Sequence, residues 1–176
     1  VETIAKTAPQ AADAARLAAA VEAANAAVIE AALNGLGKPG MGCTATCAYI
    51  ENDMLAIAHV GDSRAYLLHE GTLIRVTRDH SYVEELVDAG EITADEARVH
   101  PNRSVITRAL GSDPAMYADH FTLHIEEGDR LILCSDGLSS MIPDSDIENI
   151  ATQSSTAQIC VDNLVDAALA AGGHDN

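Results

Sequence analysis

Hydrophobic and polar positions follow two different periods along the 176-residue chain. From about Pro9 to Leu33 the chain is rich in alanine, and apolar residues return every three or four positions. This period places them on one face of a helix. The residues on that face are Leu17, Val21, Ala24, Val28 and Ala32. Asn34-Gly35 follows, so we expect one long amphipathic helix that ends there.

Four short apolar runs come next, separated by breaks of only two or three turn-forming residues. Breaks this short allow only antiparallel neighbours, so the runs predict consecutive strands of a meander. The runs are Thr44 to Ile50, Met54 to Val60, Arg64 to His69 and Thr72 to Val76. The breaks are Glu51-Asn52-Asp53, Gly61-Asp62-Ser63 and Glu70-Gly71.

Two short helices are predicted after these strands, because a serine and a threonine each stand three positions before a glutamate. These capping boxes are Ser81 with Glu84 and Thr93 with Glu96. Later elements are strands at Phe121 to Ile125 and Arg130 to Ser135, and helices at about 144–151 and 156–171 with Asp144 and Thr156 as caps. Because strands and helices do not alternate, this order favours an α+β fold with helices packed on antiparallel sheet.

Charge limits the partners that the protein can have. Asp and Glu number 27 and Lys and Arg number 10, which gives a formal net charge of −17. This excess opposes a general attraction to nucleic acid or anionic lipid. No apolar run approaches the roughly 20 residues of a membrane helix, and no secretory signal opens the chain. We therefore expect a soluble, cytoplasmic protein with a single domain.

Three of the four cysteines, Cys43, Cys47 and Cys134, lie inside β-like apolar runs, and the fourth is Cys160. We interpret them as small buried hydrophobic residues of a reducing compartment. Zinc is not expected, because Cys43 and Cys47 would lie about 13 Å apart on one face of a strand.

Three aspartates stand at strand ends or in loops beside glycine-containing turns. They are Asp62 in HVGDSR, Asp136 in CSDGL and Asp175 in GGHDN. A carboxylate in such a place supplies the hard oxygen ligand that Mg²⁺ or Mn²⁺ prefers. Taken singly, each aspartate is explained more simply as a turn residue that bonds its own backbone. A cysteine nucleophile is not expected. That route needs a C-x5-R loop, and the residue six positions after Cys134 is Ser140 and not arginine.

Seven motifs, in a fixed order, cover nearly the whole chain. They are GMGCTAT (40–46), HVGDSRAYL (59–67), TRDHS (77–81), HPNR (100–103), RALG (108–111), GDRLILCSDGL (128–138) and GGHDN (172–176). As an ordered set they resemble the bacterial type 2C, metal-dependent serine/threonine protein phosphatases. The resemblance implies two packed antiparallel sheets flanked by helices, an α-β-β-α sandwich, with a helical flap at about 80–110.

The resemblance also implies an activity and a metal site. The activity is hydrolysis of phosphoserine and phosphothreonine in substrates of a Ser/Thr kinase, by a metal-activated water and without a phosphoenzyme. Asp136 and Asp175 are similar to ligands of a two-metal centre that holds Mn²⁺ or Mg²⁺. Asp62 with Asp136 resembles the site of a third, more weakly held ion. Gly137 and Asn176 are similar to residues that support these ligands.

Basic residues gather in the flap of an otherwise acidic chain. They are Arg98, His100, Arg103 and Arg108. One interpretation is contact with the phosphopeptide, and the other is surface salt bridges to acidic neighbours in the same segment. These neighbours are Glu91, Asp95 and Glu96. Ser63 and His80 are interpreted as turn or cap residues and not as catalytic acids.

The chain departs from the family pattern at both ends. It lacks the upstream Asp-Gly-x-Gly-Gly segment, the arginine that receives phosphate, and the strand that follows the final Asp-Asn pair. We therefore expect part of one catalytic domain that is by itself inactive or weakly metal-binding. Two alternatives stay open: a phosphatase-like binding or sensor module without catalysis, and a relative that acts on one regulatory partner in a sigma-factor pathway.

Overall fold

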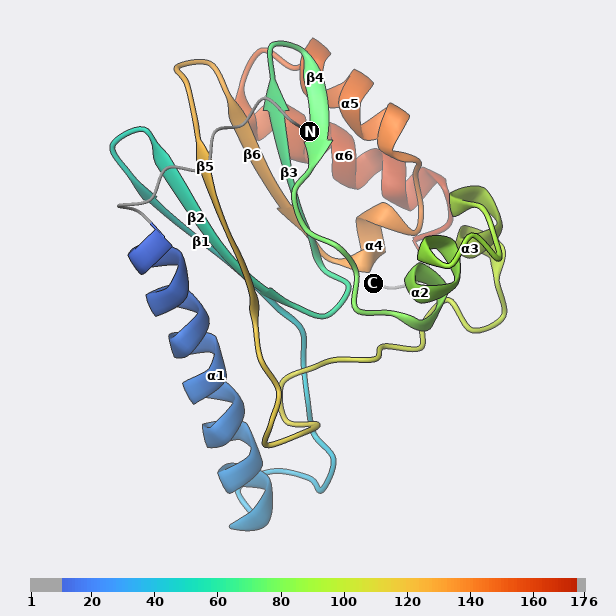
Figure 1. The fold of residues 1–176 in the computed structure, drawn as a ribbon. Coiled ribbons are helices and arrows are strands. Elements are labelled where there is room, and N and C mark those ends of the chain that lie inside the picture. The colour runs from blue at the N-terminus through green and yellow to red at the C-terminus, as the bar shows by residue number, and fades with distance from the viewer. Residues whose placement is uncertain (1–10, 174–176) are drawn as a thin grey trace. The chain divides into compact units, whose positions relative to one another are not determined.

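The computed structural model describes residues 11–173 of the chain, and Figure 1 shows them as a ribbon. These residues form two compact units, each built from two stretches of sequence. Within the described range, the first unit contains residues 11–62 and 79–125, and the second contains residues 63–78 and 126–173. Each unit has one three-stranded antiparallel sheet with helices. The predicted fold class, α+β with two antiparallel sheets and flanking helices, is confirmed.

The first unit consists of a sheet with strand order β1-β2-β5, one long helix and two short ones. Its elements are α1 (Ala11–Leu33), β1 (Ala45–Glu51), β2 (Met54–Val60), α2 (Tyr82–Asp88), α3 (Ala94–Val99) and β5 (Asp119–His124). Helix α1, blue in Figure 1, packs against β2 and β5. Their shared core contains Ala18, Val21, Ala58, Val60, Leu110, Met116 and Ala118.

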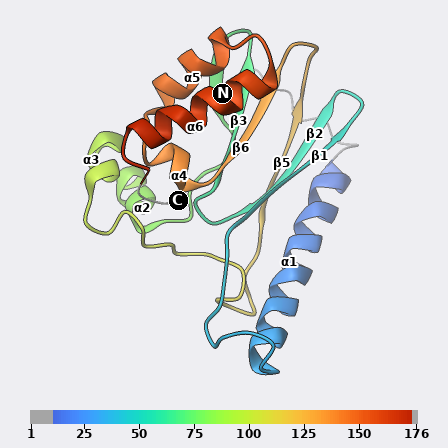
Figure 2. The same cartoon turned by 180° about the vertical axis from the view of Figure 1, so that it is seen from behind.

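The second unit consists of a sheet with strand order β4-β3-β6 and three helices that follow β6 in the chain. Its elements are β3 (Arg64–His69), β4 (Thr72–Arg75), β6 (Arg130–Cys134), α4 (Asp136–Ser139), α5 (Asp144–Gln153) and α6 (Ala157–Ala170). Figure 2, seen from behind, shows α5 and α6 lying along this sheet. The buried core between them contains Tyr66, Leu68, Ile142, Ile147, Ala151, Cys160 and Leu164.

Capping residues set several helix ends as predicted. Thr93 and Glu96 form the complete capping box of α3, and the Ser81 side chain accepts a hydrogen bond from the Glu84 amide at the start of α2. Thr156 caps α6 through the amide of Ile159. Asp144 is different, because it is the first residue of α5 and not its cap.

Within the described range, no helix is both long enough and apolar enough to cross a membrane.

The predicted four-strand meander is wrong between β2 and β3, which belong to different sheets. The two hairpins β1–β2 and β3–β4 do form, but β2 takes β5 as its second neighbour and β3 takes β6. The break Gly61-Asp62-Ser63 therefore carries the chain from one sheet to the next. A short break within one sheet and a short break between two sheets look the same in sequence, because only the pairing with distant strands distinguishes them.

The four cysteines are all free, and only Cys160 is fully buried as predicted. Cys43 is exposed, where the sequence suggested a buried residue, because its strand pairing is limited to an isolated bridge with Leu110. Cys47 and Cys134 are half-buried, and Cys160 is buried in α6.

Candidate functional site

Asp62, the first candidate metal ligand, lies two residues after the end of β2 and is only 9% exposed. The residue before it must be glycine. Gly61 has a φ of +109°, a region that L side chains rarely adopt, and a Cβ there would overlap the side chain of Thr44 and lie tightly against its Cα. The chain can thus leave the strand beside Thr44 and present Asp62 only with glycine at this position.

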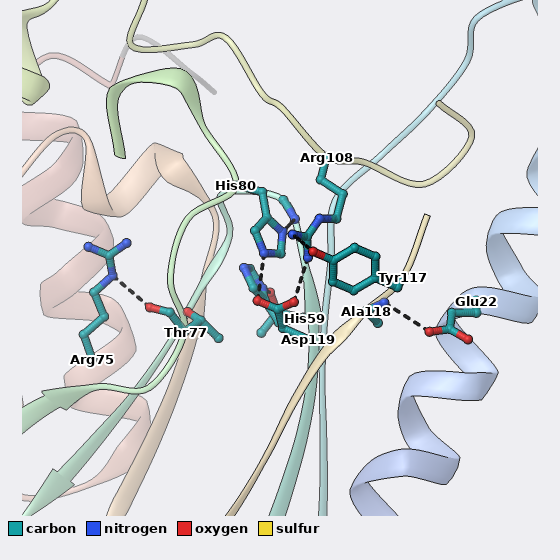
Figure 3. Close-up of polar contacts among 11 residues, drawn as sticks. Glu22, His59, Arg75, Thr77, His80, Arg108, Tyr117, Ala118 and Asp119 are labelled. Carbon is teal, nitrogen blue, oxygen red and sulfur yellow. Dashed lines mark hydrogen bonds and ion pairs between the residues drawn. The ribbon is translucent and has the colours of Figure 1, made fainter. Parts of the chain in front are cut away.

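His80 holds Gly61 through two hydrogen bonds, one from its main chain and one to its side chain. The His80 amide donates to the Gly61 carbonyl at 2.7 Å, and the Gly61 amide donates to Nδ1 of His80 at 3.0 Å. Since an amide can only donate, Nδ1 accepts and the ring proton belongs on Nε2. Nε2 therefore donates a hydrogen bond to Oδ2 of Asp119 at 3.0 Å (Figure 3). The imidazole is 2% exposed.

Asp119, the first residue of β5, is bound on both carboxylate oxygens. Arg108 donates to Oδ1 at 2.7 Å, and its other terminal nitrogen donates to the Tyr117 hydroxyl at 2.9 Å. The guanidinium carbon lies 4.0 Å from the centre of the Tyr117 ring. Burial acts to raise the pKa of Asp119, but the hydrogen bonds from His80 and Arg108 outweigh it, so the pKa is lowered. The carboxylate is therefore ionised at neutral pH.

His59 adds a second buried imidazole beside His80. Its ring centre lies 4.9 Å from that of His80 at an angle of 33°, and its Nδ1 lies 2.9 Å from the Thr46 hydroxyl. His59 and Asp119 are directly opposed in the pairing of β2 with β5. We call His59, His80, Arg108, Tyr117 and Asp119 the histidine cluster. Sequence reasoning missed it, because Asp119 belongs to no motif and meets His59 only through long-range strand pairing.

Helix α1 fixes the segment that leads from Arg108 into β5. The amide group of Asn25, a residue only 2% exposed, donates to the Asp113 carbonyl at 2.8 Å and accepts from the Gly111 amide at 2.7 Å. One turn earlier, Glu22 accepts from the amide of Ala118 at 3.3 Å, as Figure 3 shows. The histidine cluster therefore has support from the long helix as well as from the sheet.

Asp136, the second candidate ligand, opens the short helix α4 in the second unit. It is half-buried, and its carbonyl accepts a hydrogen bond from the Ser140 amide at 2.8 Å. Gly137, proposed from the sequence as a supporting residue, is buried next to it. Asp136 thus follows Ser135, the N-cap residue of α4, and lies two residues after the end of β6.

Comparison with known proteins gives these residues a family. The sequence matches the family described as Protein phosphatase 2C over residues 3–176. The chain belongs to the protein phosphatase 2C family. This confirms the resemblance noted in the sequence.

Two curated relatives show how far the similarity of this chain extends. The serine/threonine phosphatase stp of Listeria welshimeri is 39% identical over 137 residues, which are 78% of this chain and 54% of that protein. The serine/threonine protein phosphatase PstP of Mycobacterium tuberculosis is 41% identical over 165 residues, 92% of this chain and 31% of that protein. The chain therefore spans about half the length, or less, of these relatives.

A solved structure supports the same assignment. It is the structure of the catalytic domain of the serine/threonine protein phosphatase PstP in complex with two manganese ions. This chain matches it with a TM-score of 0.82 and 36% identity. The match covers 92% of this chain and 67% of that one. At this identity the likeness extends beyond the fold to the family.

The metal ligands expected from the sequence are only partly within the described residues. Asp62 belongs to the first unit and Asp136 to the second, while Asp175 and its neighbour Asn176 lie outside the described residues. Among residues 11–173, no three His, Cys, Asp or Glu side chains are grouped so that they could hold a metal ion. The chemistry of the expected donors nevertheless fits Mn²⁺ or Mg²⁺, because all three are carboxylates.

The basic residues at about 98–108 have different surroundings from one another. Arg98 lies in the last turn of α3, His100 caps its C-terminus, and Arg103 is exposed in the loop that follows. The His100 ring lies 6.1 Å from that of Tyr82. Arg108, grouped with them in the sequence, is instead bound to Asp119 in the histidine cluster.

Proposed function

We propose that the full-length protein removes phosphate from phosphoserine and phosphothreonine in other proteins, with divalent cations at the reacting phosphate and no phosphoenzyme. Family membership over residues 3–176 carries this proposal, together with relatives named serine/threonine phosphatases. Its substrates are phosphoproteins made by a serine/threonine kinase. The cytoplasmic location expected from the sequence stays a prediction.

The proposed metal ligands are Asp62, Asp136 and Asp175, with Gly137 and Asn176 in support. Mn²⁺ is favoured as the cation by the manganese complex of PstP, and Mg²⁺ and a third ion at Asp62 and Asp136 stay predictions. When bound, the ions would supply an activated water and neutralise charge on the phosphate oxygens. The aspartates would fix where that charge is placed, since each would hold an ion through its carboxylate.

The flap at about 80–110 is proposed to receive the phosphopeptide, and both units are proposed to belong to one catalytic domain. A chain with a formal net charge of −17 repels an anionic substrate unless positive charge gathers locally. Arg98 and Arg103 supply it in the flap, and His100 lies between them in the sequence. Arg108 is proposed to act indirectly, because both of its terminal nitrogens already have partners in the histidine cluster.

The test is phosphate release from a phosphothreonine peptide by the full-length protein with Mn²⁺, with chelator, and as Asp136→Asn. Loss of a ligand should lower kcat by at least about 100-fold, since even residues that only support a ligand cost about 10- to 100-fold. Asp146→Asn, the same change at an exposed site in α5, should keep full activity.

Two outcomes contradict the proposal. Activity that survives chelation or Asp136→Asn would rule out the metal mechanism. Peptide binding without any phosphate release by the unmodified protein would support a binding or sensor module instead.

A further inference from the structure

The turn that presents Asp62 passes through Gly61, the residue type with the widest backbone freedom. Gly61 lacks a side chain, and glycine moves between backbone conformations more freely than any other residue. Both polar groups of Gly61 are nevertheless held by the same residue, His80, through bonds of 2.7 and 3.0 Å. Breaking either bond would leave the other as the only restraint from His80 on the direction of the next side chain.

We propose that His80 is a positioning residue, which fixes the direction in which the Asp62 carboxylate leaves β2, and that Asp119 and Arg108 hold its imidazole in the tautomer this requires. The proposal rests on the proposed function, because it takes Asp62 as a metal ligand. It assigns a purpose to a buried polar network that the reaction itself does not use.

The tautomer of His80 decides whether Nδ1 can accept the hydrogen bond from the Gly61 amide. Nδ1 accepts from Gly61 only when it carries no proton, so the proton must sit on Nε2. The Asp119 carboxylate, at 3.0 Å from Nε2, selects that form in the way that carboxylates orient histidines around metals. Arg108 in turn binds the other carboxylate oxygen at 2.7 Å, which prevents Asp119 from rotating away.

The packing around His80 restricts its ring from a second direction. The His59 ring lies 4.9 Å away, and the His80 carbonyl accepts from the Thr107 amide at 2.8 Å. Both ring nitrogens and both main-chain polar groups of His80 therefore have named partners within the first unit.

Two substitutions separate the two bonds of the ring. In His80→Asn, the side-chain oxygen lies near the position of Nδ1 and can still accept from Gly61, but it cannot reach Asp119. In His80→Gln, the amide nitrogen lies near the position of Nε2 and can still donate to Asp119, but the acceptor for Gly61 is lost. Positioning requires the first bond, so the asparagine variant should perform better than the glutamine variant.

The measurements use the full-length protein. Hydrogen exchange of the Gly61 amide should be on the order of tenfold faster in His80→Gln than in His80→Asn, since a buried donor is left unsatisfied. The Kd for Mn²⁺ alone, measured by titration calorimetry, should be on the order of tenfold higher in His80→Gln than in the unmodified protein. With a phosphothreonine peptide, kcat should fall while KM stays within about twofold, because the proposal gives His80 no contact with substrate.

Thr46→Val is the matched control. It removes a hydroxyl that faces Nδ1 of the neighbouring buried histidine, His59, in the same sheet and leaves the Gly61 bonds in place. Its Gly61 exchange and its Mn²⁺ affinity should stay within about twofold of the unmodified protein, as expected for a change that leaves a bond intact. Equal behaviour of His80→Gln and Thr46→Val would overturn the proposal.

A second measurement needs no variant and so does not depend on folding of the substituted protein. Nitrogen NMR of labelled histidine at neutral pH should show His80 with a proton on Nε2 and none on Nδ1. A proton on Nδ1 would overturn the proposal. Neither this result nor the amide exchange requires substrate, so an inactive protein would refute the proposed function alone. An active protein with Gly61 unaffected in His80→Gln would refute the positioning role alone.

Discussion

His69, at the end of β3, is the residue whose titration has the clearest link to stability. Its Nδ1 lies 2.8 Å from Oδ1 of Asp129, and this hydrogen bond raises the pKa of His69 above the usual value of about 6.5. A raised pKa means that the folded state binds the proton more tightly than the unfolded state. The added stability is therefore complete below the unfolded pKa and is lost as the pH rises through the folded pKa.

We predict that the urea midpoint of the protein falls as the pH rises from about 6.5 through the folded pKa of His69, in part through this pair. His69→Gln should remove that part of the slope, because glutamine keeps a polar side chain but does not titrate. The measurement is a series of urea unfolding curves at closely spaced pH values. An identical slope in the variant would show that the pair contributes nothing to the pH dependence.

Single residues also show what the sequence could not provide. Asp62, Asp136 and Gly137 could be proposed because each lies in a motif, and the structure places Asp62 two residues after β2 and the other two at the start of α4. Asp119 and Tyr117 lie in no motif. Their role depends on contacts with His80 and Arg108, which no local pattern reports.

Elements built from local contacts were predictable to within a few residues. The strands Met54–Val60 and Arg64–His69 have the predicted bounds, because each is a continuous apolar run between turn-forming residues. Helix α4 was missed, since four residues carry no helical period. The pairing of β2 with β5 joins residues that are far apart in the sequence, such as His59 and Asp119, so the local pattern could not predict it.

At the scale of elements, Asn25 is the residue that ties α1 to the segment before β5. We predict that Asn25→Leu lowers the free energy of unfolding by about 1–3 kcal/mol, because the amide of Gly111 and the carbonyl of Asp113 lose their partner in a buried place. Chemical denaturation measures this. Ala26→Leu, on the exposed side of the same helix, should change it by less than about 0.5 kcal/mol. A similar loss in both variants would mean that leucine in α1, and not the lost bonds, is responsible.

At the scale of the whole molecule, the excess of acidic residues works against folding. Charges of one sign repel each other, and the repulsion is greater in the compact state than in the unfolded chain. The ion pairs near the surface, such as Arg64 with Asp144 at 3.4 Å, act in the opposite direction but are individually weak. A formal net charge of −17 should therefore decide the sign of the salt effect.

We predict that the Tm of the 176-residue chain rises between about 0.02 and 0.5 M NaCl, as screening shortens the range of repulsion from over 20 Å to under 5 Å. Calorimetric scans across this range measure the change, and glucose at matched osmolality controls for effects of water activity. Most of the rise should occur below about 0.15 M, where the screening length changes most. A Tm that falls with salt would show that attractive pairs outweigh the net repulsion, and that the acidic residues are arranged as partners for the few basic ones.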